Sequence, residues 1–367
     1  MKKQRIVLAS VLKPVDDVRM GAKLARTLQE AGSYEVIVCG FPALGASPLP
    51  YQTVVHGPYG RLNWRRWFAS WLFLFQCWRL NPEVLIVTTH ELLWAGALLR
   101  KLRGLRLVYD VQENYYLNIR YAGTFPPVVG RVVAWWVRFA ESFFSASVDH
   151  FLLAESIYDP QLRFFRHRFT VLENKVASAE PPPRQPGPGC QLLFSGTLAE
   201  STGVFRAIAL TRALHEKDPS VTLLIAGHAA HEPTLLRLRH EIRGCSYIRL
   251  MGGDKPLAHS EIETAIRQSQ AGLICYPHRP HTAGKVPTKL YEYLHARIPI
   301  ITESRWHWVA EHSHAQPFVL TDFDKPDARQ ILARLQEPFY TTAPAHLTWK
   351  EQAPAFLRAI AGLTPEK

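Results

Sequence analysis

The chain has 367 residues, of which 47% are hydrophobic and 20% charged, and its formal net charge is +12. This composition excludes a disordered protein and predicts a globular one with two domains. Five cysteines with no C-x-x-C pair disfavour a disulfide framework or a zinc site, and they favour a reducing, cytoplasmic compartment. The positive charge predicts an anionic partner. Nucleic acid is not expected, because the sequence lacks zinc-finger spacings, RNA-recognition strands and lysine–arginine blocks.

The first half of the chain alternates apolar strands with helical patterns, which predicts a doubly wound parallel sheet. Its basic start leads into an apolar run that is too short for a secretory leader, so we expect the chain to open with a strand. The predicted strands are 5–10, 35–39, 84–88, 105–109 and 150–154, and the predicted helices are 18–31, 64–80, 92–102 and 128–147. No apolar run reaches the roughly 20 residues that a membrane span needs.

A proline-rich segment, 177–189, predicts the domain boundary, because its prolines and glycines support neither a helix nor a central strand. We therefore expect an N-terminal domain over 1–176 and a C-terminal domain over 190–340. The second domain repeats the pattern, with strands at 191–195, 221–226, 247–251 and 271–275 and helices at 204–217, 232–243 and 260–268. An amphipathic helix is expected over 348–363.

The segment 286–301 predicts a loop, a short helix and a buried strand in quick succession, with Pro299 ending the helix. Lys285, Lys289 and Glu292 fall on one side of that helix, at spacings of four and three residues. A nucleotide sugar suits this arrangement: cations and free backbone N–H groups bind a diphosphate, and a carboxylate accepts both hydroxyls of a ribose. A solvated Lys–Glu pair on an ordinary amphipathic helix is the alternative.

Polar residues cluster after three predicted strands of the first half, at the edge where open α/β sheets bind ligands. The clusters are Asp16, Asp17 and Arg19; His90 and Glu91; and Asp110, Gln112, Glu113 and Asn114. They could bind an acceptor or complete a catalytic site. Surface salt bridges, helix caps and loop hydrogen bonds would explain the same residues.

Two predicted helices combine arginines with aromatic residues. The segment from Arg61 to Arg79 has four arginines, four tryptophans and no acidic residue, and the segment from Arg131 to Phe139 is similar in kind. Such helices can lie in the interface of an anionic bilayer. Burial between a sheet and a hinge would explain the apolar content equally well.

Gly196 and Gly203 lie between a predicted strand and a helix, where the lack of a Cβ permits positive φ and lets a phosphate approach the helix start. Ordinary turn glycines would look the same.

Together, the segments 15–19, 88–91 and 108–114, the glycine turn and the Lys289–Glu292 helix resemble the retaining family 4 glycosyltransferases of the GT-B fold. The resemblance covers nearly the whole chain. In the family's Glu-x7-Glu pattern, Glu292 matches the second glutamate, but Gly284 stands at the first. The arginine and lysine that commonly contact the diphosphate fall on Thr197 and Thr202, so Lys285 or Lys289 would supply the missing charge.

The resemblance implies two Rossmann-like doubly wound α/β domains facing a cleft, with the C-terminal helix crossing back to the first domain. It implies transfer of a sugar, with retention, from a nucleotide sugar to a glycan or lipid-linked acceptor. The pathway would be cell-surface polysaccharide or glycolipid synthesis, in the cytoplasm and at the inner face of the membrane. Two alternatives remain: a non-catalytic GT-B subunit that binds a partner or membrane, and a sugar-nucleotide epimerase.

The resemblance also distributes the candidate residues among roles, with no metal or other cofactor. The catalytic candidates are His90, Glu91, Asp110 and Glu113; the donor-binding candidates are Gly196, Thr197, Thr202, Gly203, Lys285, Lys289 and Glu292; and the acceptor-binding candidates are Asp16, Asp17, Arg19, Gln112 and Asn114.

Overall fold

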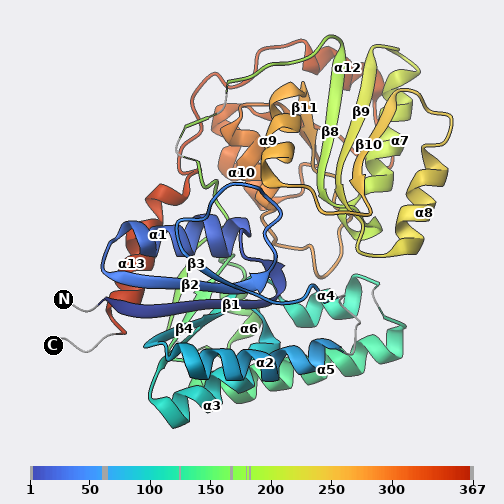
Figure 1. Cartoon of the computed structure of the whole chain (residues 1–367). Coiled ribbons are helices and arrows are strands. Elements are labelled where there is room, and N and C mark those ends of the chain that lie inside the picture. The colour runs from blue at the N-terminus through green and yellow to red at the C-terminus, as the bar shows by residue number, and fades with distance from the viewer. Residues whose placement is uncertain are drawn as a thin grey trace. The chain divides into compact units, whose positions relative to one another are not determined.

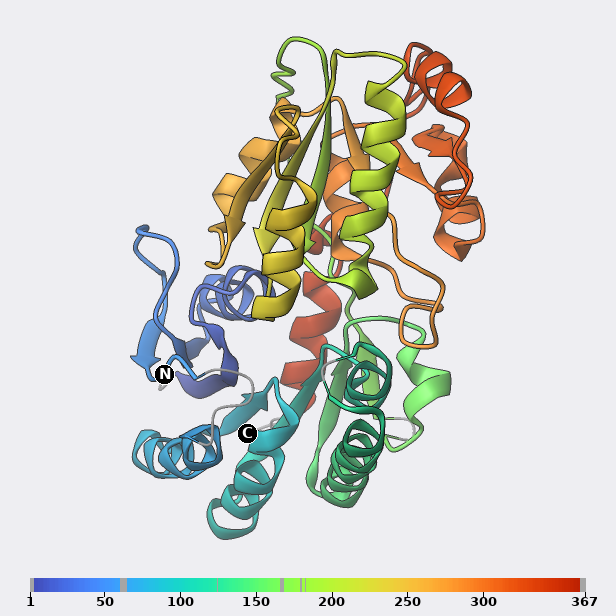
Figure 2. The same ribbon diagram turned by 90° about the vertical axis from the view of Figure 1, so that its right-hand side faces the viewer.

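The structure is a computed structural model that describes residues 3–59, 65–123, 125–165, 168–178, 180–181 and 183–363. It forms two compact units, which we call unit 1 (Met1–Ala177 with Trp349–Lys367) and unit 2 (Ser178–Thr348). Each unit is a parallel β-sheet with helices on its faces (Figures 1 and 2). The predicted α/β class with two parallel sheets is therefore confirmed.

Unit 1 contains a seven-stranded sheet in the order β3-β2-β1-β4-β5-β6-β7. Its strands are β1 (Gln4–Pro14), β2 (Tyr34–Phe41), β3 (Gln52–Val55), β4 (Val84–Val87), β5 (Arg106–Val111), β6 (His150–Leu153) and β7 (Phe169–Val171). Strands that are buried on both faces read as continuous apolar runs, which explains why β1, β4 and β5 are evident in the sequence. The strand order reverses between β1 and β4, the kind of position where doubly wound sheets bind ligands.

Helices cover both faces of this sheet. On one face α2 (Arg65–Leu80), α3 (Leu93–Arg103) and α5 (Pro127–Phe144) lie side by side, with α3 in the middle (Figure 2). On the other face lie η1 (Val18–Ala25), α1 (Arg26–Glu30) and α13 (Ala353–Ala361). The remaining short helices are η2 (His90–Leu92), α4 (Tyr115–Tyr121), η3 (Ser145–Ser147), α6 (Tyr158–Leu162) and η6 (Trp349–Glu351).

The C-terminal segment belongs to unit 1. Trp349 is buried, its Nε1 donates to Thr27 Oγ1 at 2.8 Å, and its ring lies 6.1 Å from that of Phe356 in α13. Phe356 and Ile360 then join the apolar cluster under η1 and α1. The amphipathic pattern of the tail is thus used to complete the core on this face of the sheet.

Unit 2 contains a six-stranded sheet in the order β10-β9-β8-β11-β12-β13. Its strands are β8 (Cys190–Thr197), β9 (Val221–His228), β10 (Ile248–Gly253), β11 (Ala271–Leu273), β12 (Ile300–Thr302) and β13 (Phe318–Leu320). Its helices are η4 (Glu200–Thr202), α7 (Val204–His215), α8 (Glu232–Glu241), α9 (His259–Gln268), α10 (Thr288–His295), α11 (His307–His312), η5 (Ser313–Ala315) and α12 (Ala328–Leu335).

Candidate functional site

The turn after β8 lies against the backbone that follows β11. Gly203, in the left-handed region at φ 85°, caps the start of α7, and a Cβ built on it would lie only 2.0 Å from the carbonyl oxygen of Cys275. Gly196, at φ 101°, is the last residue but one of β8, and the nearest atom to its virtual Cβ is Cε of Lys289 at 3.9 Å. Two predicted donor residues, Gly196 and Lys289, are therefore neighbours at the carboxyl edge of the sheet.

Lys289 occupies the first turn of α10 and is 7% exposed. Its Nζ lies 4.1 Å from the ring centroid of Phe194 and 5.5 Å from that of Tyr276. Within the described part of the chain its ammonium has no hydrogen bond or ion pair. Burial lowers the pKa of Lys289 to about 8, an effect that Cys275 and Glu292 partly oppose. Lys289 is therefore a desolvated cation that lies near two aromatic rings.

A buried hydrogen bond holds α10 in place. Tyr293 Oη and Ser195 Oγ lie 2.8 Å apart, and the Tyr293 ring fills the space that a side chain at Gly272 would need. Burial raises the pKa of Tyr293, so its hydroxyl stays protonated. This pair connects α10 to β8, next to the position where Lys289 lies over Phe194. The sequence does not predict this pair, because Tyr293 and Ser195 are 98 positions apart and no local pattern joins them.

The other predicted donor residues differ in their surroundings. Glu292 is half-buried one turn beyond Lys289, and Lys285 is half-buried in the preceding loop. Thr197 is exposed, whereas the Thr202 hydroxyl donates within the turn to the carbonyl oxygens of Thr197 and Ala199, at 2.7 and 2.9 Å. Thr202 therefore stabilises the turn, and it adds no charge there.

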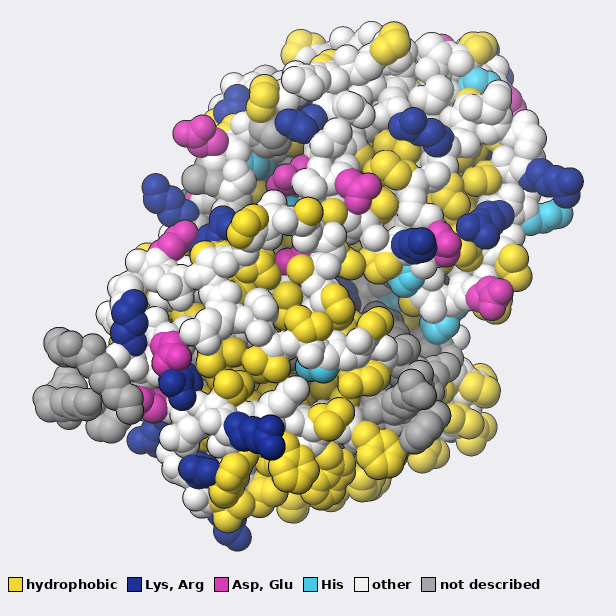
Figure 3. All heavy atoms as spheres, in the orientation of Figure 1, with side chains coloured by type: hydrophobic (Ala, Val, Ile, Leu, Met, Phe, Trp, Pro, Cys, Tyr) yellow, Lys and Arg dark blue, Asp and Glu magenta, His cyan; other side chains and the backbone are white. Residues whose placement is uncertain are grey.

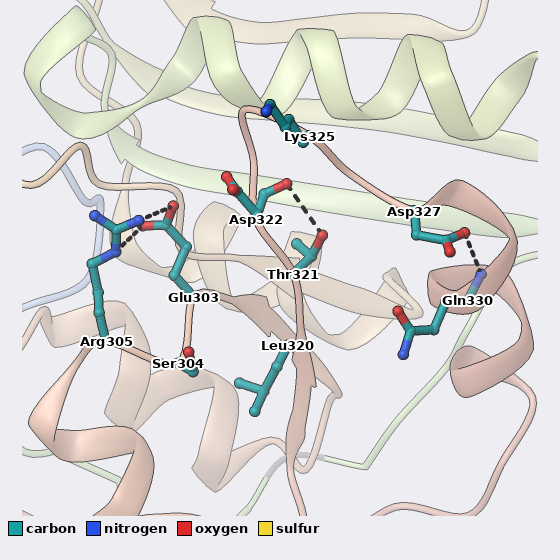
Figure 4. Close-up of a pocket in the computed structure, with 9 residues that line it drawn as sticks. All are labelled: Glu303, Ser304, Arg305, Leu320, Thr321, Asp322, Lys325, Asp327 and Gln330. Carbon is teal, nitrogen blue, oxygen red and sulfur yellow. Dashed lines mark hydrogen bonds and ion pairs between the residues drawn. The ribbon is translucent and has the colours of Figure 1, made fainter.

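A polar cavity of about 410 Å³ opens at the carboxyl ends of β12 and β13 (Figure 4). Arg206 Nη2 lies 2.9 Å from Glu303 and 3.1 Å from Asp324, while Nη1 donates to the carbonyl oxygens of Cys275 and Tyr276. Arg206 thus links this region to the backbone beside Lys289. Its own charge is already neutralised, unlike that of Lys289. The cavity is lined by Glu303, Ser304, Arg305, Leu320, Thr321, Asp322, Lys325, Asp327 and Gln330.

In unit 1 the structure joins three predicted residues into one buried network. Asp110 is fully buried, and its carboxylate accepts hydrogen bonds from Arg19 Nη2 at 2.6 Å and from Gln112 Nε2 at 2.8 Å. Arg19 is itself 4% exposed. Because each charge is already satisfied by the other, this burial argues against direct contact of Asp110 with an acceptor and supports a role in holding the strand ends.

Three further residues cap or bridge local structure, which is the alternative explanation that the sequence left open. Asp17 accepts from the backbone N–H groups at the start of η1, and Asp16 Oδ2 accepts from those of residues 44 and 45. Burial opposes ionisation of Asp17, but Lys13 and the amides together lower its pKa. Asn114 caps α4 and accepts from Arg138 Nη2 at 2.8 Å.

His90 and Glu91 lie at the carboxyl end of β4, in η2, and both are half-buried. His90 Nδ1 is 3.4 Å from Glu91 Oε2, and the His90 ring is 4.7 Å from the ring of Tyr115. Glu113 is exposed and accepts from Asn118 at 2.7 Å. Of the four catalytic candidates, these three keep access to solvent. Their roles stay predictions.

Comparison with known proteins identifies the fold. No family model matches the chain. A glycogen synthase of Mycobacterium tuberculosis is 26% identical over 162 residues, which span 43% of this chain and 37% of that relative. Sucrose-phosphate synthase from Thermosynechococcus elongatus superposes with a TM-score of 0.70 at 12% identity, covering 98% of this chain and 99% of the other. HepE from Anabaena in complex with UDP-glucose gives 0.63 at 14% identity, covering 98% and 99%. The chain therefore has the two-domain GT-B fold of these structures.

Proposed function

We propose that the chain is a glycosyltransferase that moves a sugar, with retention, from a nucleotide-sugar donor to a glycan or lipid-linked acceptor. The work of the enzyme would be cell-surface polysaccharide or glycolipid synthesis at the cytoplasmic face of a membrane. The GT-B fold supports this proposal, since a structure of the same fold was solved with UDP-glucose. The observation that carries it is the buried, unpaired ammonium of Lys289.

Lys289 and the start of α10 provide the groups that a diphosphate needs. The backbone N–H groups in the first turn of an α-helix lack partners within the helix, and the helix dipole favours negative charge there. The negative charge of a diphosphate beside Nζ would favour the protonated, charged form of Lys289, which burial disfavours. Glu292 is half-buried one turn further along α10, and its carboxylate forms no hydrogen bond or ion pair in the described part of the chain. The bare backbone at Gly196 leaves space for this ligand.

Glu292 is placed to accept the two hydroxyls of the donor's ribose, one helical turn away from Lys289. During transfer, negative charge grows on the leaving diphosphate. The fixed ammonium and helix N–H groups stabilise that charge, and the diphosphate itself takes the proton of the acceptor hydroxyl. In this mechanism Lys289 contributes to the rate by binding the transition state more strongly than the ground state.

The test is ligand-induced stabilisation of the full chain by UDP, GDP, ADP, CMP and their sugars. A nucleotide at about one hundred times its Kd raises the free energy of unfolding by about 2.7 kcal/mol. We expect one nucleotide family to raise the melting temperature of the wild type and of Lys217→Met, which removes an exposed lysine from the same unit. Lys289→Met should lose this response. Unchanged affinity in Lys289→Met would overturn the assignment.

A binding subunit without turnover is the second candidate, because Thr197 and Thr202 bring no charge to the glycine turn. Release of free sugar from the cognate donor in water separates the two, since an intact transferase hydrolyses its donor slowly and a binding module does not. The epimerase alternative predicts instead an isomerised nucleotide sugar with no acceptor present. Chromatography of the donor after incubation distinguishes all three outcomes.

A further inference from the structure

The layer formed by α2, α3 and α5 of unit 1 has an apolar outer surface, which we call the aromatic face. Figure 3 shows hydrophobic side chains gathered along this side of unit 1, where Figure 1 places the three helices. The exposed fraction is 66% for Phe75, 63% for Trp135 and 65% for Phe143. The face comprises Phe68, Trp71, Leu72, Phe75 and Trp78 of α2, Leu102 of α3, and Val128, Val129, Val132, Trp135, Trp136, Phe139 and Phe143 of α5.

These helices are apolar on both sides, unlike ordinary surface helices, which carry polar residues outward. Phe73 and Cys77 of α2 are buried on the sheet side, as is Val137 of α5. On the outside, aromatic rings form a row along α5, with Phe139 centred 5.7 Å from Trp135 and 6.0 Å from Phe143. An exposed apolar surface of this extent marks an interaction site.

The charges around the aromatic face are of one sign. Neither α2 nor α3 contains an acidic residue, and the single one in α5, Glu141, is 1% exposed. Arg79, Lys101 and Arg131 are exposed on these helices, and in the described part of the chain none of them pairs with a carboxylate. Arg103 lies over the ring of Trp78 at 3.7 Å. The surface therefore presents aromatic rings and cations with no exposed acidic group on its helices.

We propose that unit 1 binds the interface of an anionic lipid bilayer through the aromatic face, with the helices lying in the membrane plane. Tryptophan and phenylalanine rings partition into the headgroup boundary, while arginine and lysine reach the lipid phosphates. A second copy of the chain fits less well, because a two-fold contact through this face would bring the same unpaired cations together. Of the predicted segment that starts at Arg61, residues 61–64 lie outside the described residues.

Within the described ranges, no helix is both long enough and apolar enough to span a bilayer. The proposed contact is distinct from the donor site, since the aromatic face belongs to unit 1 and Lys289 to unit 2. Membrane binding and nucleotide binding can therefore be measured separately, and either proposal can fail without the other.

The experiment is flotation of the full chain with phosphatidylcholine vesicles that contain about one-third phosphatidylserine, at low salt and in about 0.5 M NaCl. We expect wild-type protein to float with anionic vesicles at low salt and less at high salt. The variant Trp135→Ser, Trp136→Ser, Phe139→Ser should lower the bound fraction about tenfold or more, because it removes three apolar anchors. A matched variant, Leu236→Ser with Leu320→Ser, removes exposed leucines of unit 2 and should bind like wild type.

A second variant tests the charges independently of the rings. Lys101→Glu with Arg131→Glu should remove the preference for anionic over neutral vesicles. Melting temperatures and nucleotide-induced shifts, measured on every variant, show that fold and donor site are intact. The proposal is overturned if wild type stays unbound at low salt. It is equally overturned if gel filtration shows a dimer that the serine variant dissociates, which would make the face a contact between copies.

Discussion

Arg19 and Asp110 are 91 positions apart in the sequence, yet their side chains form a buried bidentate pair, with Nη2 2.6 Å from Oδ1 and Nε 3.0 Å from both carboxylate oxygens. The remaining nitrogen, Nη1, donates to the carbonyl oxygen of Leu172 and to Asn174 Oδ1. The pair thus connects η1, the end of β5 and the chain after β7. These three segments form the carboxyl edge of the unit 1 sheet.

Asp110→Asn should destabilise the protein strongly, because it leaves the Arg19 guanidinium buried without a counter-charge. Breaking one side of a buried pair typically costs about 3–5 kcal/mol. The double variant Arg19→Met with Asp110→Asn removes both charges. Its loss of unfolding free energy should therefore be smaller than the sum of the losses in the two single variants. Urea unfolding measures each value. Glu200→Gln is the control: its carboxylate lies 3.4 Å from Arg237 on the surface and should contribute under about 1 kcal/mol. A similar small effect for Asp110→Asn would contradict the structural role.

The sequence placed these polar residues at the correct edge of the sheet, because strand ends can be read from apolar runs. It could not tell which side chains turn inward. The sequence predicts a catalytic role for Asp110 and an acceptor contact for Arg19, whereas their pairing depends on a tertiary contact that local patterns do not encode. Capping is an alternative that the sequence offers for Asn114, and Asn114 caps α4; for Asp17 the sequence offers a surface salt bridge, and the structure makes it the N-cap of η1. In unit 2, spacing predicted Lys289 and Glu292 on one side of α10 but not the Phe194 ring beneath the lysine.

The fold itself was more predictable at the centre of each sheet than at its margins. Central strands are buried on both faces and carry long apolar runs. The edge strands β3, β7 and β13 were not predicted, because they are three or four residues long and partly exposed. The helix predicted over 18–31 is divided into the π-helix η1 and α1. Gly21 there lies so close to Tyr51 that a Cβ would be 2.4 Å from its hydroxyl.

Lys289→Met should make the protein more stable at neutral pH while removing nucleotide binding. The pKa of Lys289 in the folded chain is about 8, below the ordinary lysine value of 10.5, because burial penalises the charged form. Between pH 8 and pH 10.5 the unfolded chain binds more protons than the folded chain. The free energy of unfolding of the wild type therefore rises with pH over this range. Lys289→Met has no buried charge, so its free energy of unfolding should not rise with pH in this way. At pH 7 it should be more stable than the wild type by on the order of 1–3 kcal/mol. Denaturant titrations from pH 7 to 10 measure this. Parallel curves for variant and wild type would show that Lys289 is not destabilising.

Gly203→Ala should be far more damaging than another glycine replacement at positive φ. Its Cβ would clash with the Cys275 carbonyl oxygen at 2.0 Å, whereas Gly244, at φ 80°, has nothing within 4 Å of a virtual Cβ. Gly244→Ala therefore isolates the cost of the left-handed backbone, about 1–2 kcal/mol. Gly203→Ala adds an overpacking cost of about 1–3 kcal/mol and should also weaken nucleotide binding, because the turn must move away from β11. Equal losses of stability would show that the close approach is not required.

Glu141 should make the stability of the protein fall as the pH rises towards neutrality. Its side chain is 1% exposed, and its Oε1 accepts from Tyr109 Oη at 2.9 Å. Burial raises its pKa to about 7, although Arg138 and Tyr109 act in the opposite direction. Between pH 4.5, the ordinary pKa of a glutamate, and pH 7 the folded chain binds more protons than the unfolded chain. The free energy of unfolding is therefore greatest below this pH range and falls through it.

Glu141→Gln keeps the acceptor for Tyr109 but cannot ionise, so its stability should not fall over this pH range. At pH 8 the variant should be more stable than wild type by on the order of 1–3 kcal/mol, and at pH 4.5 the two should converge. Glu216→Gln, which changes an exposed glutamate of unit 2, should follow the wild-type pH profile. Urea unfolding between pH 4.5 and 8 measures all three proteins.

Hydrogen exchange gives a local readout of the same effect. Because Glu141 lies on α5 beneath the aromatic face, the loss of wild-type stability at pH 8 should appear as faster hydrogen exchange in α5 than in α7. A pH-independent difference between Glu141→Gln and wild type would refute the buried, proton-binding carboxyl.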